Sequence, residues 1–402
     1  MRIRPLLFLL VALLLAAGCT QESPPIAGPT TAAQPAATLE PTSQPSATST
    51  VAPSATPAPS NTPPPSATPR PTRTPTPEPL LLVSAEDFGN DRNPLTGELV
   101  SDPNVLQRRP IAVKISNHPG GYVRPQAGLS QADLVFEHIT EANITRFTAV
   151  FYDETPPDVG PIRSGRLIDL EIPLMYDAAF AYSGSSIGVA FKLSASTFND
   201  RILRTGVPGY YRTGEDKPYE HTLYADMQRW YEVLDERELN VPPQFNSYMA
   251  FSEEPPEGGE PAGKIHINYR DVVTVDWEYD EASGRYLRWT DGEEHRDKNN
   301  DEQLSAANVV LIFAQHQTDY SICERQVGDE CYAYSEEIFI WGEGEAVILR
   351  DGQQFPATWV REQRNEMLTF VDGDGNPVPL QIGNTWFQVL PTHYEDPVTI
   401  EP

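Results

Sequence analysis

The stretch ADLVFEHITEANITRFTAVFYD, residues 132–153, decides how the chain begins to fold. Two runs rich in β-branched and aromatic residues, 132–140 and 144–153, flank a short turn at 141–143. Runs of this composition, separated by so few residues, are typical of a β-hairpin. We therefore expect two antiparallel strands here, and we place the other elements relative to them.

Three charged residues lie within this hairpin, and their spacing limits their chemistry. Glu137 and Glu141 are four residues apart, which is about 13 Å along a strand. A pair of glycosidase carboxylates needs about 5–5.5 Å or about 6.5–9.5 Å, so the pair does not predict a glycosidase. A two-residue turn would pair Glu141 with Ile144 and place Arg146 opposite Ile139, diagonal to both glutamates. Such a cluster is either a cross-strand ion network or a polar ligand-binding face.

Strand and helix patterns alternate on both sides of the hairpin. Thr222 is the expected N-cap of a helix that begins at Leu223. The alternation indicates an α/β or α+β domain over residues 80–241. Strands are expected at 109–117 (RPIAVKISN) and 177–186 (DAAFAYSGSS), and helices at 167–177 (LIDLEIPLMYD) and from Leu223 to about Glu238.

The pattern changes after a segment rich in Pro, Gly and Glu at 242–262, which has the composition of an interdomain linker. From residue 263 to residue 396 the sequence contains many short runs with a period of two, separated by turn residues. This pattern predicts a mainly antiparallel β domain. The expected fold is therefore an α/β or α+β N-terminal domain followed by a β-rich C-terminal domain.

Cysteine use is sparse and fits an exported protein. Only Cys323 and Cys331 follow Cys19, in SICERQVGDECYAY. They have no C-x-x-C spacing, and two thiols are too few for a structural zinc site. We expect a disulfide across a hairpin loop, which would contribute about 2–3 kcal/mol because the loop is short.

The chain begins MRIRPLLFLLVALLLAAGCT, with a basic start, an apolar run and small residues before Cys19. Residues 1–19 are expected to form a signal peptide, and the end of this segment resembles a bacterial lipobox, which implies acylation of Cys19 by chains such as palmitate. The alternative is a secretory signal with a chance cysteine. Residues 20–79 consist almost entirely of Pro, Thr, Ser and Ala, so we expect a disordered stalk. Either interpretation predicts an extracytoplasmic protein, and the first anchors it to the membrane.

The formal net charge is −28, from 57 acidic and 29 basic residues. Such an excess of acid argues against binding to nucleic acid and against adsorption to anionic lipid or wall polymer. An anionic ligand would therefore require a local basic site.

The segment GPIRSGR, residues 160–166, is such a basic site. Ser164 is the expected N-cap of a following helix, whose N-terminus would attract anions. Arg163 and Arg166 add planar guanidinium groups suited to carboxylate or phosphate. The loop 183–186, with Ser185, could form a second wall, because α/β folds often place ligands after their strands. Alternatively, the arginines neutralise internal acids such as Glu137, Asp169 or Glu171.

Other motifs give weaker evidence for a catalytic, binding or metal site. His221, in EHTLYAD, could act as a general base or ligand contact, or simply pack. His295 and Asp297 could begin a metal site, but a solvated loop is the simpler interpretation. DGDGN (372–376) departs from the EF-hand pattern and predicts a hairpin turn. The sequence has no G-x-S-x-G, S-x-x-K, H-E-x-x-H or Walker motif, and we expect no metal or other cofactor.

Several segments together resemble the YerB-like bacterial lipoprotein family, known as domain of unknown function 3048. The resemblance covers about residues 92–392 and implies an envelope lipoprotein, but it implies no activity and no catalytic residues. The matching segments are RPIAVKISN, VRPQAGLSQADLVFE, ITRFTAVFYD, GPIRSGR, EHTLYAD, NVVLIFAQ, GEGEAVILRDGQ, ATWVRE and IGNTWFQVLP.

We therefore expect a membrane-anchored lipoprotein that binds a cell-envelope ligand, an anionic glycan or a peptidoglycan fragment. Its candidate ligand contacts are spread over the predicted α/β domain. Two alternatives remain: a hydrolase or transferase of envelope polymers, and a scaffold that docks an envelope protein. The candidate contacts are Glu137, Arg146, Arg163, Ser164, Arg166, Ser185 and His221.

Overall fold

The computed structural model describes residues 80–402, which belong to one compact unit. The expected signal peptide, Cys19 and the stalk lie outside the described residues. Among the described helices, none is long and apolar enough to cross a membrane.

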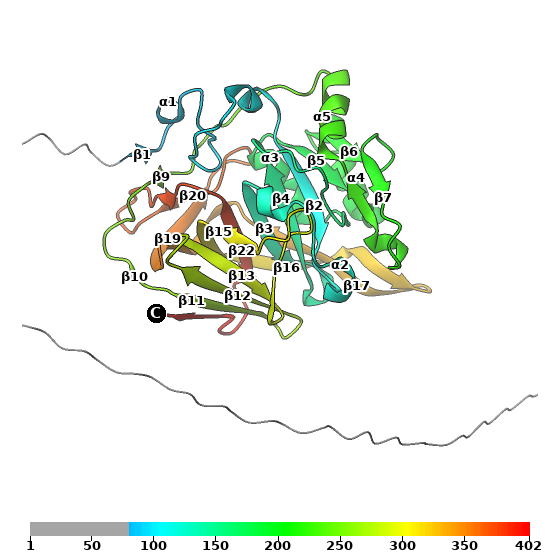
Figure 1. The fold of residues 1–402 in the computed structure, drawn as a ribbon. Coiled ribbons are helices and arrows are strands. Elements are labelled where there is room, and N and C mark those ends of the chain that lie inside the picture. The colour runs from blue at the N-terminus through cyan, green and yellow to red at the C-terminus, as the bar shows by residue number, and fades with distance from the viewer. Residues whose placement is uncertain (1–79) are drawn as a thin grey trace, which may run out of the picture. The chain divides into compact units, whose positions relative to one another are not determined.

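A 12-stranded sheet forms the centre of the unit (Figure 1). Its main path runs β10-β19-β18-β16-β22-β3-β4-β2-β5-β6, with β17 attached to β16 and β20 attached to β19. The strands are β2 (Ile111–Ser116), β3 (Leu134–Ile139), β4 (Thr145–Phe151), β5 (Ala179–Tyr182), β6 (Ile202–Arg204), β10 (Glu260–Pro261), β16 (Asn308–Val327), β17 (Glu330–Phe339), β18 (Gly342–Arg350), β19 (Gln353–Arg361), β20 (Thr369–Val371) and β22 (Thr385–Pro391).

Six of these strands run in the same direction, so their carboxyl ends meet at one edge of the sheet. β2, β5 and β6 pair in parallel, as do β16, β22 and β3. Both groups are antiparallel to β4, which lies between β3 and β2. This edge, called the carboxyl edge below, is where sheets of this kind commonly bind ligands.

The hairpin at residues 132–153 is confirmed as β3 and β4, but its register differs from the expected one by one residue. Arg146 lies opposite His138 rather than opposite Ile139. The connection is a 3-10 turn, η3 (Glu141–Asn143), with positive φ at two of its residues. Because side chains alternate along a strand, a slip of one residue changes which partners share a face.

The sheet is covered on both faces, which explains the nearly continuous apolar runs of its central strands. β2, β3 and β4 are buried along their whole lengths. One apolar cluster contains Phe136 together with residues of η4 (Leu167–Leu170), α3 (Ile172–Met175) and α4 (Ile187–Ser194). The other contains Phe147 with residues of α5 (Met227–Glu236), β11 (Lys264–Tyr269) and β12 (Val273–Asp280). Alternate residues of the same strands therefore contribute to two cores.

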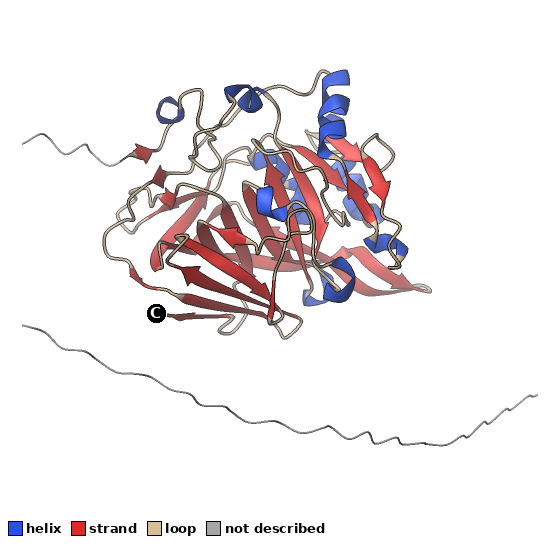
Figure 2. Ribbon diagram, in the orientation of Figure 1, coloured by secondary structure: helices blue, strands red, loops and turns tan. Residues whose placement is uncertain are grey.

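Smaller sheets and short helices complete the unit, and Figure 2 shows how far strands outnumber helices. A six-stranded sheet consists of β14 (Glu293–Glu294), β13 (Arg285–Thr290), β12 (Val273–Asp280), β11 (Lys264–Tyr269) and β23 (Val398–Glu401), with β15 (Ser305–Ala306) on β13. The remaining sheets are β1 (Leu81–Leu82) with β9 (Phe251–Ser252) and β21 (Leu380–Gln381), and β7 (Tyr210–Arg212) with β8 (Leu223–Ala225). The helices are α1 (Ala85–Phe88), α2 (Gly120–Val123), α3 (Ile172–Met175), α4 (Ile187–Ser194) and α5 (Met227–Glu236), with 3-10 turns η1 (Pro103–Gln107), η2 (Leu129–Gln131), η4 (Leu167–Leu170), η5 (Asn199–Arg201) and η6 (Tyr219–His221).

The described chain is mostly strand, arranged in several sheets, and two details differ from the expected fold class. β16 and β22 pair in parallel, so the C-terminal half is not wholly antiparallel. β22 also lies between β16 and β3, which joins strands of the two expected blocks in one sheet. The segment 242–262 contains β9 and β10, both of which pair with other strands.

The two expected helices are shorter than predicted. The segment 167–177 divides into η4 and α3, separated at Glu171. α5 begins at Met227, because the preceding residues from Leu223 form β8. Its N-cap is Asp226 rather than Thr222: the Asp226 carboxylate accepts a hydrogen bond from the backbone N–H of Gln228 at 3.0 Å.

Replacing this cap tests its assignment. Asp226→Ala is expected to lower the free energy of unfolding by about 1 kcal/mol, because an N–H of the first turn of α5 loses its acceptor. Asp226→Asn should retain most of the stability. Asp216→Ala, the loss of an exposed acid, is the matched control and should have little effect. Urea denaturation of the full chain, followed by tryptophan fluorescence, measures all three, and an unchanged Asp226→Ala variant would contradict the assignment.

Candidate functional site

The GPIRSGR segment lies at the carboxyl edge, between the ends of β2 and β5. The backbone N–H of Arg163 donates to the carbonyl of Lys114 at 3.0 Å, and the carbonyl of Arg163 accepts from the N–H of Ser183 at 3.2 Å. The segment therefore extends the sheet where two parallel strands end. Backbone hydrogen bonds on both sides of the segment fix the directions in which its side chains point.

Ser164 does not cap a helix, contrary to the expectation. The N-cap position of η4 is Arg166, and the carboxylate of Asp169 accepts from the backbone N–H of Arg166 at 2.7 Å. Since η4 has only four residues, its dipole is too short to form an anion site. The carbonyl of Ser164 instead accepts a hydrogen bond from the guanidinium of Arg146 at 3.2 Å.

Arg166 is neutralised by internal acids. Its Nε donates to Oε2 of Glu141 at 2.7 Å, and its Nη2 contacts the other oxygen of the same carboxylate. Its Nη1 lies 3.5 Å from Oε2 of Glu324. Burial raises the pKa of Glu141, but the hydrogen bond and charge of Arg166 outweigh it and hold that pKa below its ordinary value. The expected internal partners were Glu137, Asp169 and Glu171, so the actual carboxylates were missed.

Arg163 differs from Arg166, because no described carboxylate forms an ion pair with it. Its described side-chain contact is a 3.5 Å hydrogen bond from Nη1 to the carbonyl of Glu220. Burial lowers the pKa of Arg163, the charge of Glu220 opposes this shift in part, and the charge of Arg166 lowers the pKa further. The guanidinium is thus partly desolvated, and no described carboxylate lies within ion-pair distance of it, although the charges of Glu220 and Glu141 act on it from farther away.

Arg146 lies beside both of these arginines and is 6% exposed. Its Nη2 is 3.8 Å from Glu141, and its Nε is buried with no hydrogen-bond acceptor among the described residues. Burial, followed by the charge of Arg166, lowers the pKa of Arg146 to about 9. Arg146, Arg163 and Arg166 are called the arginine cluster below; three guanidinium groups there face two carboxylates.

His221 lies near the arginine cluster, next in sequence to Glu220, whose carbonyl accepts from Arg163. It is 7% exposed, and its Nδ1 is buried without a described partner. Its ring stacks on Tyr122 at 5.6 Å between centroids and 12° between planes, while Tyr122 itself is 44% exposed. Burial and the charge of Arg163 lower the pKa of His221, so this imidazole is neutral at pH 7.

The loop after β5 reaches the same region through its serines. Ser185 is partly buried in this loop. Ser186 is the N-cap of α4, where its Oγ accepts from the N–H of Val189, and the same hydroxyl donates to Glu324 at 2.9 Å. The serine loop therefore meets the arginine cluster through Glu324.

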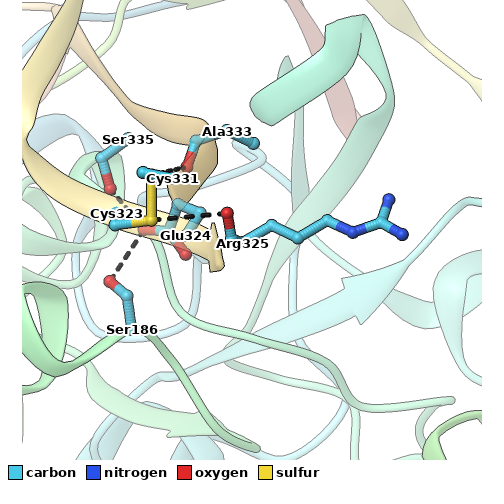
Figure 3. Close-up of a disulfide and its surroundings, with 7 residues drawn as sticks. All are labelled: Ser186, Cys323, Glu324, Arg325, Cys331, Ala333 and Ser335. Atoms are coloured by element: carbon cyan, nitrogen blue, oxygen red, sulfur yellow. Dashed lines mark hydrogen bonds between the residues drawn. A yellow bond between two sulfur atoms is a disulfide. The ribbon is translucent and has the colours of Figure 1, made fainter. Parts of the chain in front are cut away.

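The expected disulfide between Cys323 and Cys331 is confirmed, with Cα atoms 5.8 Å apart (Figure 3). It joins β16 to β17, and Glu324 is adjacent to it in sequence. The Glu324 carboxylate also accepts a hydrogen bond from the hydroxyl of Ser335 on β17. No sequence pattern linked this glutamate to residue 166.

A buried polar network lies beneath the arginine cluster, and sequence reasoning missed it. Nζ of Lys114 lies 2.8 Å from the carboxylate of Asp169, 2.9 Å from the hydroxyl of Thr148 and 2.6 Å from Nε2 of His138. Nδ1 of the same histidine faces the carbonyl of Ile139 at 3.0 Å, which fits a neutral ring that accepts at Nε2. A lysine in the middle of a buried strand, IAVKIS, was the available signal.

Glu137 is not part of this site, contrary to the expectation. The one-residue change in register places it on the opposite face of the sheet from Arg146. There its carboxylate accepts from Nη2 of Arg288 at 2.6 Å, from Thr145 at 2.7 Å and from Asn117 at 3.1 Å. Glu137 and Arg288 are both fully buried.

His295 and Asp297 are buried, so a solvated loop was the wrong interpretation for them. Nε2 of His295 lies 2.7 Å from the side-chain oxygen of Gln126. Asp297 organises the 126–130 loop by accepting from the N–H groups of Gly128 and Ser130, at 3.1 and 2.8 Å. Among the described residues, no group of three potential ligands is arranged to hold a metal ion.

DGDGN is a turn, as predicted. The carboxylate of Asp372 accepts from the backbone N–H groups of Asp374 and Asn376, at 2.9 and 2.8 Å. This closes the loop onto itself and connects β20 to the following segment.

A cavity of about 640 Å³ is lined by residues of α2 and of the 290–301 segment. Arg124 at its wall is paired with Asp291 at 2.6 Å. Acidic side chains dominate the remaining polar lining, namely Glu293, Glu294 and Asp301. The charged lining of this cavity is mainly negative, whereas the arginine cluster has more guanidinium groups than carboxylates.

Comparisons with known proteins cover most of the described unit. Residues 95–240 match the N-terminal domain, and residues 265–387 the C-terminal domain, of "Protein of unknown function (DUF3048)". A Bacillus subtilis (strain 168) protein with the name "Putative lipoprotein YerB" is 27% identical over 303 residues, which are 74% of this chain and 86% of that protein. The crystal structure of YerB protein from Bacillus subtilis matches with a TM-score of 0.65 and 25% identity, over 77% of this chain and 99% of that one. The name of this relative fits a lipoprotein and a membrane-associated location. The two matched domains show that the chain belongs to the DUF3048 family.

Proposed function

We propose that the protein is an extracytoplasmic lipoprotein, tethered through Cys19, that binds a carboxylate-bearing glycan of the cell envelope at the arginine cluster. The observation that carries this proposal is that two buried nitrogen atoms lack a described hydrogen-bond partner and that a neighbouring guanidinium lacks a described ion pair. Arg163 has no described carboxylate partner, and Nε of Arg146 and Nδ1 of His221 are buried without described partners. Buried polar groups are nearly always satisfied in folded proteins, so an external acceptor fits this arrangement.

The ligand chemistry follows from the donors. Arg163 and Arg146 present guanidinium N–H groups, which bind carboxylate or phosphate through paired hydrogen bonds. The rest of the protein is strongly acidic, so an extended anionic polymer would be repelled outside this position. A ligand with a single carboxylate on an otherwise neutral framework suits the charge distribution better than a polyphosphate.

The aromatic side chain beside the arginines supports a sugar ring as that framework. Tyr122 lies against His221 and leaves part of its ring exposed. An exposed aromatic ring offers a flat apolar surface to a pyranose, while the adjacent donors fix its orientation. A peptidoglycan fragment, with a lactyl or peptide carboxylate on a sugar, combines both features.

The hydrolase or transferase alternative receives less support. It needed Glu137 beside His221 and the arginines, but Glu137 is held by Arg288 on the opposite face. His221 alone could accept a proton, yet no described carboxylate is hydrogen-bonded to it to set its orientation. A scaffold that docks an envelope protein remains an alternative, and no described contact favours it.

Binding of soluble muropeptides to the purified full chain tests the proposal. Arg163→Ala is expected to weaken binding by about 10–100-fold, because a charge-assisted hydrogen bond contributes about 1.5–3 kcal/mol. Arg325→Ala, which removes an exposed arginine that has no described ion pair, is the matched control and should bind as the parent does. Isothermal titration calorimetry gives both affinities.

Two results would contradict the proposal. One is the absence of binding to any carboxylate-bearing muropeptide or uronic acid oligosaccharide. The other is equal binding by the parent and Arg163→Ala. The reduced muropeptide amide, which lacks the carboxylate, should bind weakly to both proteins and so identifies the group that is recognised.

A further inference from the structure

The distal parts of β16 and β17, residues 315–339, form a two-stranded arm that projects beyond the sheet (Figure 1). Cys323 and Cys331 link its strands. The pairing register shifts between Cys323 and Arg325: Cys323 pairs with Tyr334, but Arg325 pairs with Ala333. Glu324 is therefore the extra residue of a β-bulge, a feature that redirects side chains.

The bulge directs Glu324 away from the arm and into the arginine cluster. The side chain is only 2% exposed although it comes from a projecting ribbon. It accepts from Ser186 at the start of α4 and from Ser335 on the partner strand (Figure 3), and it lies 3.5 Å from Arg166. Its charge also favours the protonated form of Arg146.

Apolar contacts also hold the arm against the body of the protein, because Ile322 and Ile338 are buried in the same core as residues of η4 and α4. Ile322 packs on Gly188 of α4, where a Cβ atom would come within 2.8 Å of the isoleucine. Lys192 of the same helix lies 3.6 Å from Asp319, and both are partly solvated, so this pair contributes little. Beyond Ile322, the bulged segment is constrained by the disulfide, by strand pairing with β17 and by the contacts of Glu324.

We infer that Glu324 is an internal carboxylate that occupies the arginine cluster in place of an external one, and that the Cys323–Cys331 disulfide holds it there. Reduction of the disulfide frees the bulged segment, withdraws one negative charge from the three arginines and opens the cluster to an anionic ligand. This inference rests on the proposed function, because it describes how access to the same site is controlled.

The redox step needs a dithiol reductant, such as a reduced thiol–disulfide oxidoreductase. Its thiolate attacks one sulfur of the disulfide and forms a mixed disulfide, and its second thiol then resolves that intermediate. Two electrons and two protons pass to Cys323 and Cys331, which become thiols, and the reductant becomes a disulfide. Both cysteines are close enough to the surface to be attacked, since they are buried only in part or exposed.

The first experiment measures ligand binding by the full chain in both redox states. The Cys323→Ser/Cys331→Ser double variant and the oxidised Glu324→Gln variant are each expected to bind muropeptides about 10-fold more tightly than the oxidised parent. Asp329→Asn removes an exposed acid from the tip of the same arm and should leave affinity unchanged. Equal affinity in the parent, the cysteine variant and Glu324→Gln would overturn the inference, while the proposed function would stand.

The second experiment needs no ligand, so it tests whether Glu324 covers the arginine cluster separately from whether the cluster binds a muropeptide. Phenylglyoxal modification of Arg166, followed by mass spectrometry, reports how accessible the cluster is. We expect modification to be several-fold faster in the reduced protein and in Glu324→Gln than in the oxidised parent, and unchanged in Asp329→Asn. If Arg166 reacts at one rate in all four proteins, the arm does not cover the cluster. If it reacts faster as expected but no variant binds muropeptides, the covering contact is supported and the proposed ligand is wrong.

Discussion

Replacing Arg288 with alanine is expected to lower the free energy of unfolding by about 3–5 kcal/mol, because breaking a buried ion pair leaves an uncompensated charge in the interior. The change leaves the carboxylate of Glu137 fully buried without its charged partner. It also opens space between aromatic rings, because the guanidinium lies 4.6 Å from the ring centroid of Trp386 and 5.0 Å from that of Trp277.

A double-mutant cycle separates the charge from the packing. Arg288→Met with Glu137→Gln removes both charges and fills most of the volume, and the new side-chain amide can still accept from Thr145. This pair should lose only about 1–2 kcal/mol, because apolar replacement of a buried ion pair is often nearly neutral. Arg325→Ala is the exposed control. Urea denaturation that shows similar losses for Arg288→Ala and the double variant would mean that the unpaired carboxylate is not the main cause, because the double variant has neither charge and keeps most of the volume.

The hairpin shows how far the sequence alone predicts this fold. Its composition predicted two buried antiparallel strands at 132–153, and both formed. The register could not be predicted, since the number of residues in the turn depends on whether residues 142 and 143 adopt positive φ. That single residue of slip separated Glu137 from Arg146 and gave each a different partner. Local patterns identify strands, whereas the faces of a buried strand are decided by partners far away in sequence.

The arginine cluster shows a second limit of the same kind. Its arginines were found because basic residues are conspicuous in an acidic chain. Their neutralising carboxylates were not, because Glu324 reaches Arg166 from a bulge 158 residues later in the chain. The disulfide beside it was predicted from spacing and compartment alone. The spacing of two cysteines predicts a disulfide between them, but it does not predict which neighbouring side chain, here Glu324, points into the protein.

The polar network beneath the cluster has a functional consequence for the whole edge. Asp169 accepts from Lys114 at 2.8 Å, from Thr148 at 2.8 Å and from the N–H of Arg166 at 2.7 Å. One carboxylate thus satisfies a buried cation and also fixes the backbone from which Arg166 extends. Loss of Asp169 should therefore disturb both stability and the geometry of the arginine cluster.

Asp169→Asn is accordingly expected to cost about 3–5 kcal/mol of unfolding free energy at pH 7, because it leaves the ammonium of Lys114 fully buried without a counter-charge. Burial lowers the pKa of Lys114 to about 8, while Asp169 opposes this shift. The folded pKa is below the ordinary value of about 10.4, so the unfolded chain binds more protons between pH 8 and pH 10. In that window the contribution of Lys114 to stability rises with pH.

Without the carboxylate, the folded pKa of Lys114 falls further and the window extends below pH 8. The stability deficit of Asp169→Asn relative to the parent should therefore shrink as the pH rises toward about 8, where only the variant gains stability, and should stay level between pH 8 and pH 10, where Lys114 is neutral in both folded proteins. Urea denaturation at several pH values measures this difference, and Lys114→Met/Asp169→Leu, which has neither charge, should show no such pH-dependent deficit. A deficit that stays constant as the pH rises to about 8 would mean that Asp169 acts through its hydrogen bonds to Thr148 and Arg166, and not by neutralising Lys114.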